Sequence, residues 1–378
     1  MSSVSAVSAV SRPALRHVLT HLVTPLLMCL GMGIAYLSAF HAPAPHQLPV
    51  AVVGQGPQAQ VLAQTLKDKA GDGLDVTTVA DPDAARQRLL DRDLVAAYVP
   101  DADAPTLLVA TANSETSASA AEKVFTQVAA HQGKPLAVQE LTPLPAGDPT
   151  GQGLFFLLVA LSIGSYGSVA VLGAAGAALA VRVRALLGLG VALVVSLLGT
   201  ALAGPVFHLV DHGLLGVWAM SWLYSAGIVA IGTALHAFLG RWTTLTMMAL
   251  FVMLNFTSSG GIFQPELQNG FYRALHSFWN GAGFLEGVRD HVYFGGRAGL
   301  GGHVATLSGW LAAGAVLLLA AARTERKRAL AAAPAAVPAP APAVAPSAEQ
   351  PAGHPVEQPA ERLAAEAAEE EMEETVGV

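Results

Sequence analysis

Cysteine, charged residues and nucleotide-binding motifs are scarce in this 378-residue chain, and each scarcity excludes a class of function. A single cysteine, Cys29, can form neither an intramolecular disulfide nor a cysteine-based metal cluster, so we expect no metal site. Only 12% of the residues are charged, and no basic stripe with interleaved aromatic residues occurs, which argues against nucleic acid as a partner. GxxxxGK[S/T] and GxSxG motifs are also missing, so we expect no ATPase or esterase chemistry, no catalytic residues and no cofactor.

Hydrophobic residues make up 53% of the chain and gather in six long blocks. Each block supplies the roughly 20 residues that cross about 30 Å of hydrocarbon. The first block is longer than the apolar core of a signal peptide, so we interpret it as an uncleaved span. The sequence therefore predicts an α-helical multi-pass membrane protein with six transmembrane helices, in the blocks 18–40, 153–180, 185–206, 214–238, 243–262 and 304–322.

The lysine and arginine residues of the short connections predict the orientation of these spans. With six spans, all the basic clusters fall on one side: Arg12 and Arg16, Arg182 and Arg184, Arg241, and the group at 323–328. We therefore expect a plasma (inner) membrane protein with both termini cytoplasmic, namely residues 1–17 and the tail 323–378. The tail is rich in alanine and proline and then acidic, a composition that predicts disorder.

Residues 41–150 lie between the first and second spans and would face the outside of the cytoplasm. Their pattern predicts an extracytoplasmic α/β domain with a small mixed or parallel sheet. We expect strands at 49–54, 74–80, 94–99, 106–112 and 136–141, and helices at 57–70, 82–92 and 115–132. The turn Gly54-Gln55-Gly56 resembles a dinucleotide-binding loop, but Pro57 suits the first position of a helix, so we interpret it as a tight strand-to-helix turn.

Four segments carry a resemblance to a known family: PVAVVGQG, DPDAARQRLLDRDLVAAYVP, PLPAGDPTGQGLFF, and the stretch from TSSGGIFQPELQNG to VYFGG. In this order around one span and a five-span bundle (151–322), the chain resembles the ABC-2 type transporter permeases, in the branch of phage-infection-protein-like membrane proteins. The resemblance implies a membrane subunit that forms a homodimer and moves a hydrophobic or amphipathic substrate outward, driven by a separate cytoplasmic ATPase. The short connection at 180–185 departs from this pattern, because it offers an ATPase little to bind, and we expect the segment 12–21 to bind it instead.

The segment 258–303, between the last two spans, holds the candidate transport or gating residues except Asn255, which lies near the end of the fifth predicted span. If it re-enters the bilayer, the turn at Gly260-Gly261 must be shielded from lipid, since lipid cannot satisfy backbone polar groups. We expect an ion pair between Glu266 and Arg289 to bracket two half-helices. The full candidate set is Asn255, Pro265, Glu266, Arg289 and Asp290.

Small residues recur at helical spacing in the third predicted span and form a candidate helix-packing face: Gly188, Ala192, Ser196, Thr200 and Gly204. Such faces allow close helix approach in lipid, either within the bundle or at a dimer seam or translocation groove. No charged residue lies inside spans two to six, which argues against an ion-driven carrier. Two functions stay open: an ABC-2 type export permease, or a non-transporting receptor or cell-envelope scaffold whose outer domain binds a partner.

Overall fold

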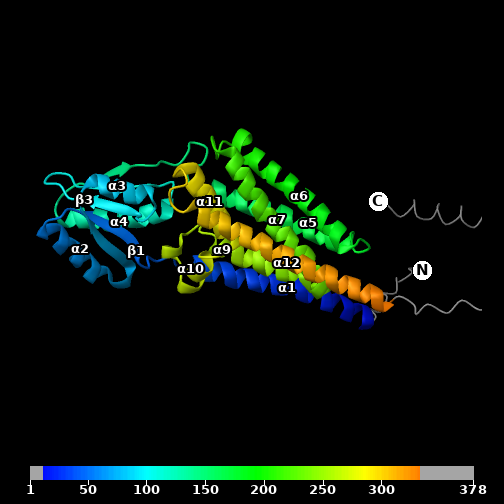
Figure 1. Ribbon diagram of the computed structural model, residues 1–378. Helices are drawn as coiled ribbons and strands as arrows, with labels where there is room; N and C mark the ends of the chain where they lie inside the picture. Colours follow the sequence, from blue (N-terminus) through cyan, green and yellow to red (C-terminus); the bar gives the residue numbers. More distant parts are fainter. Residues whose placement is uncertain (1–11, 333–378) are drawn as a thin grey trace, which may run out of the picture. The chain divides into compact units, whose positions relative to one another are not determined.

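A five-stranded mixed sheet forms in residues 48–140, which we call the sheet region (Figure 1). The spatial order of its strands is β2-β1-β3-β4-β5, and all neighbours pair in parallel except β3 and β4. Strand β1, which has a neighbour on each side, is buried almost throughout, as expected of a strand covered on both faces. The strands are β1 (Leu48–Val53), β2 (Leu74–Val79), β3 (Ala96–Val99), β4 (Thr106–Val109) and β5 (Ala137–Glu140).

Helices cover both faces of this sheet. On one face lie α2 (Pro57–Ala70) and α4 (Glu115–His131), and on the other lies α3 (Pro82–Leu90). All eight expected strands and helices are present, and their ends differ from the expected ones by no more than three residues. The turn before α2 has Gly54 at φ 139° and Pro57 in the first helical turn, as the interpretation of a tight strand-to-helix turn requires.

The computed structural model describes residues 12–332, and this part of the chain is mostly helical. Five helical stretches in it are long and apolar enough to cross a membrane, as in a multi-pass helical membrane protein. The stretches are Leu15–Phe40, Gly153–Ala174, Val181–Val206, Leu214–Ser258 and Leu300–Ala331. They contain α1 (Arg12–Phe40), α5 (Gly153–Ala174), α6 (Val181–Ala201) and α12 (Leu300–Ala332), with the fourth divided as described next.

The fourth stretch folds back on itself. It contains α7 (Leu214–Leu239), the turn η3 (Gly240–Trp242), α8 (Thr243–Met248), a π-helical turn η4 (Ala249–Leu254) and α9 (Asn255–Ser258). Its 45 residues would extend about 67 Å as one straight helix. Instead, the carbonyl oxygens of Gly213 and Gly260, just outside its two ends, accept hydrogen bonds from His291 and Arg289 of a single helix. The reversal lies at Gly240, whose φ of 53° favours glycine.

Helix α7 lies at the centre of the helical region and packs against α5, α6 and α11 (Asn280–Tyr293). Helix α12 also contacts α7, since a Cβ on Gly314 would lie 2.7 Å from that of Ala230. The outer faces of α1 and α6 carry rows of exposed leucine side chains, which suits contact with lipid tails. The remaining elements are the short helical turns η1 (Gly71–Gly73), η2 (Leu202–Val206) and η5 (Pro265–Leu267), and helix α10 (Gly270–His276).

Several helix boundaries differ from the expected ones: α1 begins at Arg12 rather than 18, α5 ends at Ala174 rather than 180, and α12 begins at Leu300 rather than 304. Two further differences change where charged residues lie. Helix α6 begins at Val181, so the connection before it is 175–180 and Arg184 lies inside the helix, buried beside Glu325 at 3.8 Å. Helix α12 continues to Ala332, so residues 323–332 are helical rather than part of a disordered tail, because they are mostly good helix formers that precede Pro334. The rest of the expected tail, 333–378, and residues 1–11 lie outside the described residues.

Candidate functional site

Helix α11 connects the helical region with the sheet region and is buried on nearly every side. Glycines allow this close packing, because a Cβ on Gly281 would lie 2.5 Å from Asn255 Oδ1 and one on Gly287 would lie 2.9 Å from Met220 Sδ. The helix has 14 residues, about 21 Å, too few to cross a bilayer alone. It therefore serves as a buried connecting element, and its charged side chains need partners from the protein.

Two arginines share the carboxylate of Glu286 at the centre of α11. Arg289, one turn further along the helix, bonds to Glu286 Oε1, and Arg92 from the sheet region bonds to Glu286 Oε2. All three side chains are at most 11% exposed. Burial raises the pKa of the Glu286 carboxyl, but the attraction of Arg289 and Arg92 outweighs it, and the pKa lies below its usual range. Glu286 is therefore ionised at neutral pH.

Arg92 reaches this carboxylate because of how α3 ends. The helix ends at Leu90 with Asp91 as its C-cap, and Arg92 adopts a left-handed backbone with φ 63°, as residues just past a helix often do. Its Nε donates to Asn113 Oδ1 at 2.7 Å, and its guanidinium lies 5.5 Å from the centre of the Phe294 ring. Hydrogen bonds to Asn113 and Glu286 and the face of the Phe294 ring together hold the guanidinium in place.

Glu266 forms a second connection between the two regions. Its Oε1 accepts a hydrogen bond from Ser117 Oγ at 2.8 Å, and its backbone carbonyl accepts one from His46 N at 2.7 Å. Burial raises the pKa of the Glu266 carboxyl, although the bond from Ser117 lowers it. Thr116 adds a bond from its hydroxyl to the carbonyl of Ile262 at 3.2 Å. The start of α4 is therefore fixed to segment 259–299, and we call the whole set of contacts between the sheet region and this segment the joint.

His276, the last residue of α10, connects segment 259–299 to the end of α9. Its Nδ1 donates to the carbonyl of Ser258 at 2.9 Å, at the end of α9, where helix carbonyls lack helical partners. Burial lowers the pKa of this imidazole, while Glu286 raises it, and the pKa lies below its ordinary value. Gln268 similarly donates to the carbonyl of Thr257 at 2.7 Å. Side chains of segment 259–299 thus satisfy the carbonyls at the end of the fourth stretch.

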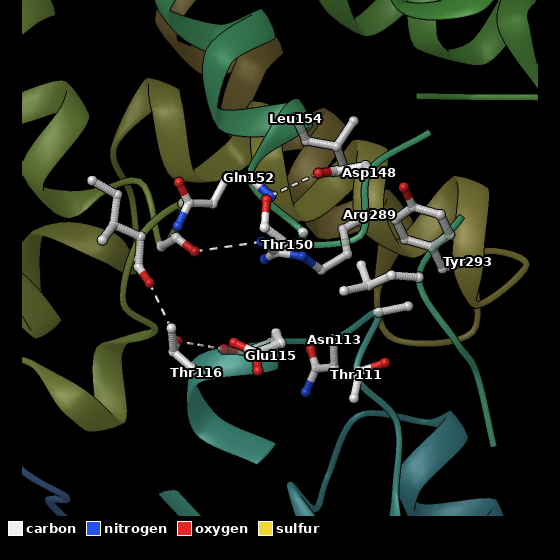
Figure 2. Close-up of a pocket in the computed structure, with 17 residues that line it drawn as sticks. Thr111, Asn113, Glu115, Thr116, Asp148, Thr150, Gln152, Leu154, Arg289 and Tyr293 are labelled. Carbon is white, nitrogen blue, oxygen red and sulfur yellow. Dashed lines mark hydrogen bonds between the residues drawn. The ribbon is translucent and has the colours of Figure 1, made fainter. Parts of the chain in front are cut away.

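A small polar cavity lies within the joint (Figure 2). Figure 2 shows Asn113, Glu115 and Thr116 of the sheet region on one side and Arg289 and Tyr293 of α11 on the other. The volume open to water is about 20 Å³, which suffices for about one water molecule. Burial raises the pKa of the Tyr293 hydroxyl to about 12, so the ring stays neutral. The cavity is too small for a hydrophobic substrate.

The expected ion pair between Glu266 and Arg289 is wrong. Arg289 pairs with Glu286 on its own helix, and Glu266 bonds to Ser117 instead. Local geometry explains the difference, because residues three apart on a helix meet, whereas Glu266 lies in the turn η5 facing α4. Asp290 is also separate from this cluster, since its Oδ1 accepts from Ala298 N at 3.0 Å and so fixes the loop after α11.

The other candidate residues have structural positions. Pro265 begins η5. Asn255 is fully buried, and its amide donates to the Tyr224 hydroxyl at 2.6 Å and accepts from Gly281 N at 2.7 Å. It therefore connects α7, α9 and α11 through one side chain. Among residues 12–332, no group of three histidine, cysteine, aspartate or glutamate side chains is arranged to hold a metal ion.

The small-residue face of α6 is covered within the chain. A Cβ on Gly188 would lie 2.6 Å from Val229 of α7, and one on Gly204 would lie 2.7 Å from Leu214. Ala192 and Ser196 are fully buried, and Thr200 is 9% exposed. These residues pack α6 against its neighbours in the same chain, so this face is not free to form a dimer seam.

Sequence reasoning missed Arg92, His276 and Glu286. The spacing of Glu286 and Arg289 was a usable signal, because a buried helix can hold charges only as pairs. Arg92 gave no signal, since it follows an ordinary surface helix and its partner lies 194 residues away.

A scan of protein-family models and searches of curated proteins and solved structures give no match to this chain.

Proposed function

We propose that this chain is the membrane subunit of an ABC-2 type export permease in the plasma membrane. In this proposal residues 41–150 face outward, both termini are cytoplasmic, and a separate ATPase drives outward movement of a hydrophobic or amphipathic substrate. The observation that carries the proposal is the joint, because Glu286 and Arg289 lie on α11, which packs against both α5 and α7. A rearrangement of those helices must therefore move the sheet region with it.

If the fourth stretch crosses the membrane twice, the described residues cross it six times in all. The joint end of the helical region includes Gly213 and Gly260, whereas Gly240 lies where the chain turns back. At the opposite end from the joint, Val181 N donates to Glu325 Oε2 at 3.0 Å, which joins the start of α6 to the end of α12. The basic residues of both segments then lie on one side of the membrane, as the cytoplasmic side requires.

Cysteine labelling tests this arrangement. Cys29 is replaced by alanine, and single cysteines are placed at exposed Arg241 and at exposed Gln60 of α2. A membrane-impermeant maleimide applied to intact cells should label Q60C only, and R241C should be labelled only after permeabilisation. If R241C resists labelling in both conditions, the fourth stretch crosses once and the six-span arrangement is wrong.

Purification from native membranes in mild detergent tests export. We expect a stoichiometric nucleotide-binding subunit by mass spectrometry, with an ATPase rate that lipophilic compounds change. Deleting residues 2–12 should abolish its association, whereas truncation after Ala332 should leave it intact. Association that survives the deletion would contradict binding through segment 12–21.

The second candidate is a receptor or envelope scaffold that transports nothing. The covered face of α6 favours it, because the homodimer that the resemblance implies would need another surface. If the chain purifies alone or only with envelope proteins, this candidate replaces the export permease.

A further inference from the structure

A groove runs along the sheet region between α2 and α4, on the face of the sheet away from α3. Its volume is about 540 Å³, within the roughly 300–1,000 Å³ typical of small-molecule sites. It is separate from the cavity in the joint, whose residues it does not share.

The two walls of the groove repeat one pattern. Leu62, Leu66 and Lys69 of α2 are spaced four and three residues apart, so they share one helix face. Val124, Val128 and His131 of α4 have the same spacing. Each wall therefore presents two apolar side chains and then one nitrogen-bearing side chain.

The two helices are antiparallel, which places the nitrogen-bearing side chains at opposite ends. Helix α2 ends beside Gln47, whose N–H donates to Asp72 O at 2.7 Å, and α4 begins beside Glu266, whose carbonyl accepts from the neighbouring His46. Lys69 thus lies near the residues that follow α1, and His131 lies at the far end. The part of the α2 wall that lines the groove extends about 12 Å, the rise from Leu62 to Ala70.

Charge narrows the class of ligand. The groove is lined by Lys69 and His131 and by no aspartate or glutamate. Lys69 is exposed, so its ammonium can pair with an anionic group at the groove, whereas a cation would meet repulsion. A ligand with one anionic end and a short apolar chain pairs with the ammonium and packs against Leu62, Leu66 and Val128.

We propose that this groove binds a single-chain anionic amphiphile from the membrane surface, a medium-chain fatty acid carboxylate, with its carboxylate at Lys69 and its chain along Leu66, Leu62 and Val128. Pro45 and Gly73 form the groove end beside Lys69, and Pro45 follows closely on Phe40, the last residue of α1. The ligand therefore enters from the end that is nearest to α1. This inference does not depend on export, because a receptor with the same groove would bind the same ligand.

Photolabelling of the full chain in zwitterionic lipid nanodiscs tests the proposal. The probe is a medium-chain fatty acid with a diazirine on its chain, and labelled peptides are mapped by mass spectrometry. We expect labels in α2 and α4 that excess unlabelled fatty acid removes, above the background on lipid-facing helices. Labels confined to α1, α6 and α12 would overturn the proposal.

Matched variants test separately the role of the Lys69 charge and the role of the open space in the groove. Lys69→Gln should reduce groove labelling at least tenfold, whereas Lys67→Gln, on the same turn of α2 but outside the groove, should not change it. Val128→Trp fills the groove and should abolish labelling, whereas Val61→Trp, at a 65% exposed position outside it, should not. The alcohol analogue of the probe should label the groove at least tenfold less than the acid. Equal labelling by acid and alcohol, or no effect of Lys69→Gln, would refute the carboxylate's role.

Discussion

Replacing Glu286 with glutamine should open the joint more than replacing either arginine that it binds. The Gln variant leaves two buried cations, Arg92 and Arg289, without a carboxylate, and removing one partner of a buried pair costs about 3–5 kcal/mol. Arg92→Met leaves Glu286 paired with Arg289, so the loss is that of charge-assisted hydrogen bonds, about 1.5–3 kcal/mol. Arg86→Met is the control, because its pair with Asp83 is 40% and 88% exposed and contributes about 0–1 kcal/mol.

Hydrogen exchange of the α11 amides in nanodiscs measures these costs. When the helix recloses faster than its amides exchange, the opening equilibrium sets the exchange rate, and each 1.4 kcal/mol of local stability changes that rate about tenfold. We expect exchange to rise roughly 10²-fold or more in E286Q, about 10-fold to 100-fold in R92M, and less than about fivefold in R86M. If E286Q does not accumulate, R92M against R86M still tests the joint. An R92M effect no larger than that of R86M, or an E286Q effect smaller than that of R92M, would refute the reasoning.

Four further predictions follow from other buried groups. The lowered pKa of His276 means that the unfolded chain binds more protons just below pH 6.5, so thermal stability should fall as pH drops through that range; His276→Gln should flatten this slope in melts at several pH values. Glu266→Gln should remove a gain in stability that develops as pH falls toward the ordinary carboxyl pKa, because a raised pKa means that the folded chain binds more protons there than the unfolded chain. Gly188→Leu should lower the unfolding temperature through overpacking of about 1–3 kcal/mol or more, whereas Gly190→Leu, with open space at its Cβ, should not. Asn255→Leu should cost about 1–3 kcal/mol in chemical denaturation, because it leaves the buried Gly281 N–H without its acceptor, whereas the Tyr224 hydroxyl keeps Ser162 as a partner; unchanged stability would show that the amide is dispensable.

Local patterns in the sequence were enough to predict the sheet region. Short apolar runs with β-branched residues, as at the start of the sheet region, predicted strands, and Pro57 at a helix start predicted how β1 turns into α2. The apolar blocks predicted the long helices in the same way, because length and hydropathy are properties of contiguous segments.

Contacts between distant segments could not be predicted in this way. The sequence pointed to Glu266 and Arg289 as charges near the membrane, but their partners depend on which faces of α4 and α11 meet. The end of α12 was missed for a different reason. The charged residues 323–328 end an apolar block, yet they remain good helix formers, so hydropathy and helix propensity give different boundaries there.

The bond between Arg92 and Glu286 also bears on how the chain is made. Because 194 residues separate the two, the sheet region is synthesised long before the carboxylate that neutralises Arg92 exists. During synthesis this arginine must stay hydrated, and α3 and the start of α4 lack the surface against which they finally pack. Completion of the joint is therefore a late step of biogenesis, and ribosome-bound chains that end before α11 should leave Arg92 open to reagents that modify arginine.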